Sequence, residues 1–282
     1  MFERIKFPDG QISAKWNPEN KHEPPPALIA QRINSYEDLF FVRAIADILP
    51  YPIEHSLFIP CMFGQRSDRR FSSMQSFDLH LITDIVNECG FSRVTIFDPH
   101  SDVTMALINK SIKKSSFEYV EKAVKDIVIK QIGSENPESV LLVSPDAGAY
   151  KKVFEYGEKL NLSVMGAMKH RDKDGKITLM FTHDVEGKDC LIVDDLCDGG
   201  YTFELLGKAL KEHKARKVYL YVSHGLFSKG FAGMYNAGID HIYCTNSVKD
   251  LVGPYGIKNK TSEDMYPENA FSEDYVTQYK VI

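Results

Sequence analysis

Short apolar runs alternate with longer amphipathic segments along most of the chain. Five runs are rich in Val, Ile, Leu and aromatic residues, and their length and composition are typical of strands that are buried on both faces. They lie at 56–61 (SLFIPC), 93–98 (RVTIFD), 139–144 (SVLLVS), 190–195 (CLIVDD) and 217–224 (KVYLYVSH). Two weaker runs, 26–31 (PALIAQ) and 241–246 (HIYCTN), are further strand candidates.

Several segments between these runs have apolar residues at the spacing typical of a helix. Segment 35–49 opens with Ser35 as a candidate N-cap and places its apolar residues on one stripe. Segments 76–90, 148–162 and 201–215 show a similar pattern. Because strands alternate with helices, we expect an α/β fold with a mainly parallel sheet and right-handed crossovers.

This alternation occurs twice, and the polar, turn-rich stretch QIGSENPES at 131–139 separates the two occurrences. The sequence therefore predicts two similar α/β halves, residues 1–134 and 135–282. Each half is expected to be a mainly parallel sheet flanked by helices.

Polar residues follow the candidate strands at the points where the strands end. The five strong runs lead into FGQRSDRRF, DPHSD, SPDAG, DDLCDGGYT and SHG. Ligands of open parallel sheets bind beyond the carboxyl ends of the strands. One such end would mean little, because helix caps also favour Asp and Ser, but five together predict a polar site.

The most informative stretch is 190–203, CLIVDDLCDGGYTF. Two glycines before a helix allow backbone N–H groups to approach an anion, which favours phosphate. Neighbouring carboxylates suit the hydroxyls of a sugar, or a divalent cation. Ribose 5-phosphate offers both a phosphate and a diol, whereas the simpler alternative is a strand-to-helix turn capped by Asp198. The residues concerned are Asp194, Asp195, Asp198, Gly199, Gly200, Tyr201 and Thr202.

LIVDDLCDGGYT resembles the ribose-phosphate-binding signature of phosphoribosyltransferases and of ribose-phosphate diphosphokinases, also called phosphoribosyl pyrophosphate synthetases. Four other segments resemble the synthetases in order and spacing: FPDGQ at 7–11, FGQRSDRR at 63–70, FDPH at 97–100 and VSPDAG at 143–148. The resemblance runs from about Phe7 to beyond His224. It implies two phosphoribosyltransferase-like halves that transfer the diphosphate of ATP to the anomeric hydroxyl of ribose 5-phosphate, with chemistry between them.

The resemblance also implies a role for particular residues. Phe7, Asp9 and Gln11 would contact adenine and its surroundings, while Arg66, Asp68 and Arg69 would hold ATP and its phosphates. His100 and Asp146 would help to place Mg²⁺. Lys169 and Arg171 match the two catalytic cations of the family, on a segment, MKHRDKDGKIT, that we expect to be a mobile loop. Taken singly, each has a simpler interpretation: Arg66 to Arg70 as a solvated charged loop, His100 as a buried imidazole, Phe7 as core, and Lys169 with Arg171 as surface.

Three departures from the family pattern bear on the substrate. Tyr201 stands where the family has a glycine in its phosphate loop, and Gln11 replaces a glutamate. The chain also begins so close to FPDG that we expect the usual first strand and helix to be missing, which puts the family's usual oligomer and allosteric control in question. The bulk of Tyr201 would crowd a simple phosphate, or it would contact something larger at that end, as in ADP-ribose.

Two hypotheses of other kinds remain open: a silent regulatory paralogue and a phosphoribosyltransferase. The first leaves Lys169, Arg171, His100 and Asp146 unexplained, and the second leaves FPDGQ and FGQRSDRR without a role.

Composition bears on the binding partners, the state of the cysteines and the location of the protein. The net charge of −5 gives no support for a nucleic-acid partner. The five cysteines are scattered without paired metal spacing, as is usual for reduced thiols, and no signal peptide or long apolar run is visible. We therefore expect a cytoplasmic protein without a membrane partner, which requires Mg²⁺ and binds ATP and a ribose 5-phosphate compound. We also expect a homo-oligomer, because in the family the loop equivalent to FPDGQ completes a neighbour's site.

Overall fold

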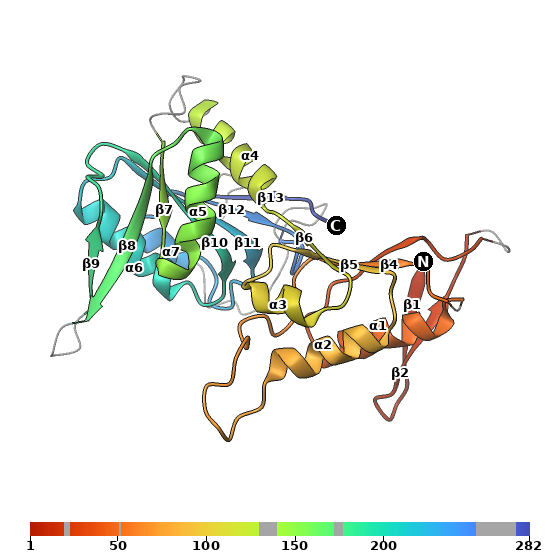
Figure 1. The fold of residues 1–282 in the computed structure, drawn as a ribbon. Helices are drawn as coiled ribbons and strands as arrows, with labels where there is room; N and C mark the ends of the chain where they lie inside the picture. Colours follow the sequence, from red (N-terminus) through yellow and green to blue (C-terminus); the bar gives the residue numbers. More distant parts are fainter. Residues whose placement is uncertain (20–22, 51, 130–139, 172–176, 252–274) are drawn as a thin grey trace. The chain divides into compact units, whose positions relative to one another are not determined.

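The computed structural model describes residues 1–19, 23–50, 52–129, 140–171, 177–251 and 275–282, with side chains described outside 168–179. The chain forms two compact units (Figure 1), Met1–Ser115 together with Ile282, and Ser116–Val281. Each unit is α/β and is built around its own, mainly parallel, sheet.

The first unit contains a four-stranded sheet in the order β3-β4-β5-β6, with all neighbours parallel. Its strands are β3 (Leu28–Ala30), β4 (Ser56–Ile59), β5 (Arg93–Phe97) and β6 (Ser111–Lys114), and its helices are α1 (Tyr36–Ile48), α2 (Asp78–Glu88) and α3 (Asp102–Leu107). Helix α1 begins where Ser35 accepts a hydrogen bond from the Asp38 N–H, as the sequence predicts. The buried stripes of α1 and α2 share one apolar core with β4 and β5.

An antiparallel hairpin, which the apolar pattern did not predict, precedes this sheet. Its strands are β1 (Phe2–Lys6) and β2 (Ile12–Trp16). Arg4 and Lys6 on β1 pair with Asp38 and Glu37 on α1, at 2.6 Å and 2.9 Å. The hairpin is therefore fixed against α1, and the FPDG turn joins its two strands.

The second unit contains a seven-stranded sheet in the order β13-β12-β11-β10-β7-β8-β9. The strands are β7 (Val140–Ser144), β8 (Val164–Arg171), β9 (Ile177–Phe181), β10 (Asp189–Cys197), β11 (Lys217–Gly225), β12 (His241–Thr245) and β13 (Val276–Tyr279). All neighbours are parallel except β8 and β9. The helices are α4 (Phe117–Ile127), α5 (Ala147–Leu160), α6 (Tyr201–Glu212) and α7 (Ala232–Asn236).

Both faces of this sheet are covered, as the apolar runs predict. Alternate residues of β10 and β11, such as Ile192 and Leu220, share a core with Phe203 and Leu206 of α6. Helices α4 and α5 contact one another (Figure 1), and Tyr243 on β12 donates a hydrogen bond of 2.9 Å to Asp126 on α4. The α/β fold class and all seven predicted strands are therefore confirmed.

The compact units divide at 115/116, whereas the polar stretch predicts a boundary at 134/135. Helix α4 accounts for the difference, because its contacts are with the second unit. The Ser116 and Tyr156 hydroxyls are 3.0 Å apart, and the Phe117 and Tyr156 rings meet edge to face. Residues 130–139 lie outside the described part of the chain.

The expectation of a loop at MKHRDKDGKIT is also corrected. Residues 168–171 continue strand β8, and 177 begins strand β9, which pairs with it antiparallel. Lys169 and Arg171 lie opposite Leu179 and Ile177 in the register. The interval 172–176 lies outside the described residues.

Two features of composition can be checked in the structure. All five cysteines are buried and free. No described helix has both the length and the apolar content that a bilayer crossing needs.

Gly157 tests the packing of α5 on the sheet. A Cβ at this position would lie 2.2 Å from Val164 Cγ2, so Gly157→Ala should destabilise the protein by about 1–3 kcal/mol through overpacking. At an open helical site the same change would stabilise by roughly 1 kcal/mol. Chemical denaturation measures the change in the free energy of unfolding and so gives its sign. Glu155→Ala, on the exposed face of α5, is the control. Increased stability of Gly157→Ala would contradict the close packing.

Candidate active site

The carboxyl ends of three neighbouring strands meet at one edge of the second sheet. Strand β10 pairs with β7 on one side and with β11 on the other, all parallel. The segments at and beyond these strand ends, 144–148 (SPDAG), 198–202 and 226–230, therefore lie at the same edge. This is where ligands of open parallel sheets bind.

The acidic pair, Asp194 and Asp195, lies within β10 near its carboxyl end. Asp195 is only 7% exposed, and its backbone N–H donates a 2.8 Å hydrogen bond to the Asp194 carboxylate. Burial raises the pKa of the Asp194 carboxyl well above its usual range, and the adjacent Asp195 carboxylate raises it further. The charge of Lys152, on α5, acts in the opposite direction. Ionising both carboxyl groups is therefore unfavourable here, and a bound cation or hydroxyl donors would stabilise the charged forms.

The turn from β10 into α6 is built around two glycines. Gly200 is the N-cap of α6 and has φ +83°, a conformation that favours glycine. Within the described residues, the Gly199 and Gly200 N–H groups donate no hydrogen bond. Open N–H groups at the start of a twelve-residue helix suit an anion, and phosphate in particular.

A second segment, the turn 226–230 after β11, supports this loop. The Leu226 and Phe227 N–H groups donate to the Cys197 carbonyl at 2.9 Å and 3.2 Å. Ser228 binds Asp198 twice, from its N–H to the carbonyl and from Oγ to the carboxylate, at 3.1 Å and 2.7 Å. From the sequence, only SHG at 223–225 was identified as the polar end of β11, and the turn 226–230 was not. His224 is fully buried, and its Nδ1 lies 2.9 Å from Ser247 Oγ. This hydrogen bond helps to hold the end of β11 in place.

The predicted ATP residues lie in the first unit. The turn between β1 and β2 holds Phe7, Asp9 and Gln11, and is closed by hydrogen bonds from the Phe7 N–H to the Gln11 carbonyl and from the Gln11 N–H to Asp9, at 2.9 Å and 3.0 Å. The Phe7 ring is 44% exposed although it is apolar, so it is available for stacking on a planar ligand.

The loop that carries Arg66, Asp68 and Arg69 follows β4, and His100 follows the neighbouring strand β5. Buried Gln65 joins the two loops, because its side-chain oxygen accepts a 3.0 Å hydrogen bond from the His100 N–H. Arg66, Arg69 and His100 are exposed. The first unit therefore brings two guanidinium groups and an imidazole to one edge of its sheet, although Gln65 itself was not among the predicted site residues.

Asp146 is the N-cap of α5, and its carboxylate accepts a 3.0 Å hydrogen bond from the Ala149 N–H. His100 and Asp146, the predicted magnesium pair, belong to different units. Among the described residues, neither unit holds a group of three His, Cys, Asp or Glu side chains arranged for a metal. Lys169 and Arg171 are placed on β8 by their backbone alone.

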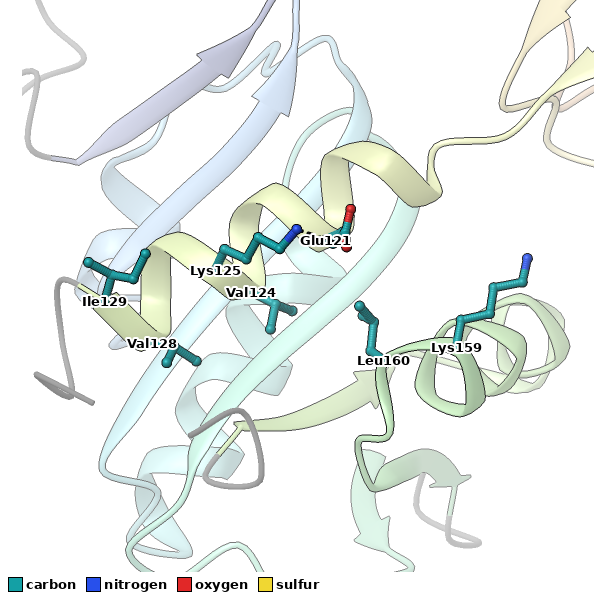
Figure 2. A pocket seen from close by; sticks show the side chains of 7 residues that line it. All are labelled: Glu121, Val124, Lys125, Val128, Ile129, Lys159 and Leu160. Atoms are coloured by element: carbon teal, nitrogen blue, oxygen red, sulfur yellow. Dashed lines mark ion pairs between the residues drawn. The ribbon is translucent and has the colours of Figure 1, made fainter. Parts of the chain in front are cut away.

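A cavity of about 450 Å³ lies between α4 and the end of α5 (Figure 2). It contains none of the predicted site residues. Its lining consists of Glu121, Val124, Lys125, Val128, Ile129, Lys159 and Leu160. The candidate active site is therefore the polar strand edge, not this cavity.

The raised pKa of Asp194 gives a pH-dependent prediction. Between the ordinary carboxyl pKa and the raised one, the native state binds more protons than the unfolded state, so native stability falls as pH rises. Asp194→Asn removes this penalty and should raise the thermal midpoint more at pH 7 than at pH 4. Glu158→Gln, on the exposed face of α5, is the control. An equal change at both pH values would contradict the raised pKa.

Comparisons with known proteins agree with this geometry. The phosphoribosyl transferase domain family matches residues 116–231, beginning at the first residue of the second unit. A phosphoribosylpyrophosphate synthetase from Mycobacterium smegmatis has a similar fold, with a TM-score of 0.76 at 17% identity, covering 100% of this chain and 86% of that one.

Curated relatives include ribose-phosphate pyrophosphokinases from several organisms. The enzyme of Marinomonas sp. is 27% identical over 250 residues, which cover 86% of this chain and 77% of the relative. That of Sulfurisphaera tokodaii is 25% identical, covering 86% and 82%. Ribose-phosphate pyrophosphokinase 4 of Saccharomyces cerevisiae is 29% identical, covering 67% and 57%. With the motifs in the same order and the glycine turn in place after β10, the chain is similar to the ribose-phosphate pyrophosphokinases over most of its length.

Proposed function

We propose that this protein transfers the diphosphate group of ATP to the anomeric hydroxyl of ribose 5-phosphate, giving phosphoribosyl pyrophosphate and AMP. The observation that carries this proposal is the end of β10. There a half-buried Asp194 and a buried Asp195 are followed, three residues later, by a glycine turn with open N–H groups. The turn suits the 5-phosphate, and the carboxylates suit the ribose hydroxyls.

The first unit would supply the nucleotide site. Its exposed Phe7 ring would stack on adenine, with Asp9 and Gln11 nearby. Arg66 and Arg69, with Asp68, would hold the phosphates of ATP, since guanidinium groups match phosphate oxygens in pairs. Diphosphoryl transfer depends mainly on positioning and charge neutralisation, so this chemistry needs cations more than a covalent nucleophile.

His100 and Asp146 would contribute to binding Mg²⁺. Mg²⁺ commonly uses one or two protein ligands and fills its remaining positions with water and substrate phosphates, so a site with few protein donors fits. Asp146 is exposed and contributes a carboxylate, while His100 is exposed in a loop fixed by Gln65. When bound, the ion would neutralise charge on the phosphate oxygens. Lys169 and Arg171 on β8 would add positive charge at the transferring group.

A second acceptor, ADP-ribose, is favoured by one observation. Tyr201 opens α6 beside the glycine turn, and its side chain is 63% exposed. An exposed ring at this position would be able to stack on a group attached beyond the 5-phosphate. The chemistry would be unchanged, the product would be ADP-ribose pyrophosphate, and the role would be in NAD salvage.

Cytoplasmic location and assembly into a homo-oligomer are parts of the same proposal. So is the view that the protein is neither a silent regulatory paralogue nor a phosphoribosyltransferase. The ATP residues of the first unit support the diphosphokinase over both, because neither alternative has a use for the full set.

The test is AMP formation from ATP and Mg²⁺, with ribose 5-phosphate and ADP-ribose supplied in parallel. We expect turnover with ribose 5-phosphate. Turnover with ADP-ribose alone would assign the second acceptor and make Tyr201 part of a wider site. No AMP with either acceptor would reject the diphosphokinase activity.

Lys169 provides a test of the catalytic cations. Lys169→Ala should lower kcat by roughly 100- to 1,000-fold, because an interaction made mainly in the transition state is lost, while ATP binding and folding stay close to wild type. Lys188→Ala, at the opposite end of β10 from the acidic pair, is the matched control. Unchanged turnover in Lys169→Ala would remove the proposed role of this strand.

Asp195 separates the two substrate sites. Asp195→Ala should raise the KM for the ribose acceptor by about tenfold and leave the KM for ATP nearly unchanged, because a hydrogen bond to a charged group is lost only at the acceptor. Steady-state kinetics with each substrate varied in turn measures both constants. The opposite ranking would mean that the two sites are assigned to the wrong units.

A further inference from the structure

Lys229 lies next to the glycine turn, although nothing in the sequence distinguished it. Its side chain runs across Gly199, so that a Cβ at Gly199 would lie 3.4 Å from Lys229 Cδ and 3.6 Å from Cε. The absence of a side chain at position 199 therefore gives room for this lysine stem as well as for a ligand.

The backbone that carries Lys229 is fixed in place. The preceding residue, Ser228, is bound to Asp198 by two hydrogen bonds. Phe227 is buried, and its ring fills the space beside Gly225, where a Cβ would lie 2.1 Å from Phe227 Cε2. The Lys249 ammonium donates a 2.6 Å hydrogen bond to the Leu226 carbonyl. The fold therefore positions the start of the Lys229 side chain before any ligand arrives.

The charges around the turn explain why such a cation is needed. Asp194, Asp195 and Asp198 precede the Gly199 and Gly200 N–H groups within six residues of chain. A phosphate dianion would be repelled by these carboxylates unless a cation lay beside it. Within the described residues Lys229 makes no ion pair or hydrogen bond, so its ammonium is available to a ligand.

We propose that Lys229 is a specificity-determining residue of the acceptor site, and that its ammonium pairs with the phosphate on the 5-position of the ribose. This inference rests on the proposed function. Lys229 selects acceptors that carry this phosphate over unphosphorylated ribose, while the acidic pair recognises the sugar hydroxyls. The lysine acts on the acceptor and makes no contribution to ATP binding.

Two variants test the charge separately from the shape. Lys229→Met keeps an unbranched stem over Gly199 and removes the charge, whereas Lys229→Arg keeps the charge. Lys229→Met should raise the KM for ribose 5-phosphate by about 10- to 100-fold, the range expected for a charged hydrogen bond, with the KM for ATP and the thermal midpoint unchanged. Lys229→Arg should retain most of the acceptor affinity. Lys188→Met is the control.

Two kinetic results would overturn the proposal. The first is an unchanged acceptor KM in a folded Lys229→Met protein. The second is an equal rise in the KM values of both substrates, which would indicate a structural role for Lys229.

A binding measurement separates this proposal from the proposed function. Calorimetric titration of ribose 5-phosphate, ADP-ribose and ribose into wild type and Lys229→Met needs no turnover. Weaker binding of a phosphorylated ligand by Lys229→Met supports the role of Lys229, even if the wild type forms no AMP. Equal binding by the two proteins, or no binding of either phosphorylated ligand by wild type, rejects it. AMP formation without any effect of Lys229→Met would reject Lys229 alone.

Discussion

The parallel pairing of β10 between β7 and β11 is the constraint on which the second unit depends. Because all three strands run the same way, the segments that leave them emerge at one edge, and the central strand contributes the acidic pair. Parallel strands require crossover connections: helix α6 lies in the one between β10 and β11, and α5 in the one between β7 and β8. A reversed strand would send its turn to the opposite edge and would separate the carboxylates from the glycine turn.

The same arrangement creates an electrostatic problem at this edge. Two adjacent carboxylates lie near the end of strand β10, and burial and their mutual repulsion raise the pKa of Asp194. Such a site is costly unless a ligand or a cation offsets the charge. Lys152 on α5 acts on the Asp194 carboxylate, and Lys229 in the turn after β11 lies beside Gly199, so two separate connections bring positive charge to this end of the sheet.

In the first unit, parallel neighbouring strands again bring polar loops to one edge of the sheet, but here the loops carry cationic side chains. Strands β4 and β5 are parallel neighbours, and the loops after them are joined by the buried side chain of Gln65. The hairpin that carries Phe7 is fixed to α1 by the ion pair between Arg4 and Asp38, which is partly buried and close. Each element that presents a predicted ATP residue is thus held by its own contacts within the unit.

The sequence by itself determined the parallel α/β class, because runs such as 190–195 and 217–224 are apolar on both faces and only a doubly covered strand buries them. It also determined the strand-end motifs, since glycines and carboxylates at fixed spacing have few other uses. It did not predict the β1–β2 hairpin, whose residues are half exposed and lack a clear period, nor β13, which pairs with β12 across a long interval of sequence. Only the tertiary structure assigned α4 to the second unit, continued β8 through Lys169, and placed Lys229 over Gly199. Those features depend on contacts between residues far apart in the chain, which local hydrophobic pattern does not encode.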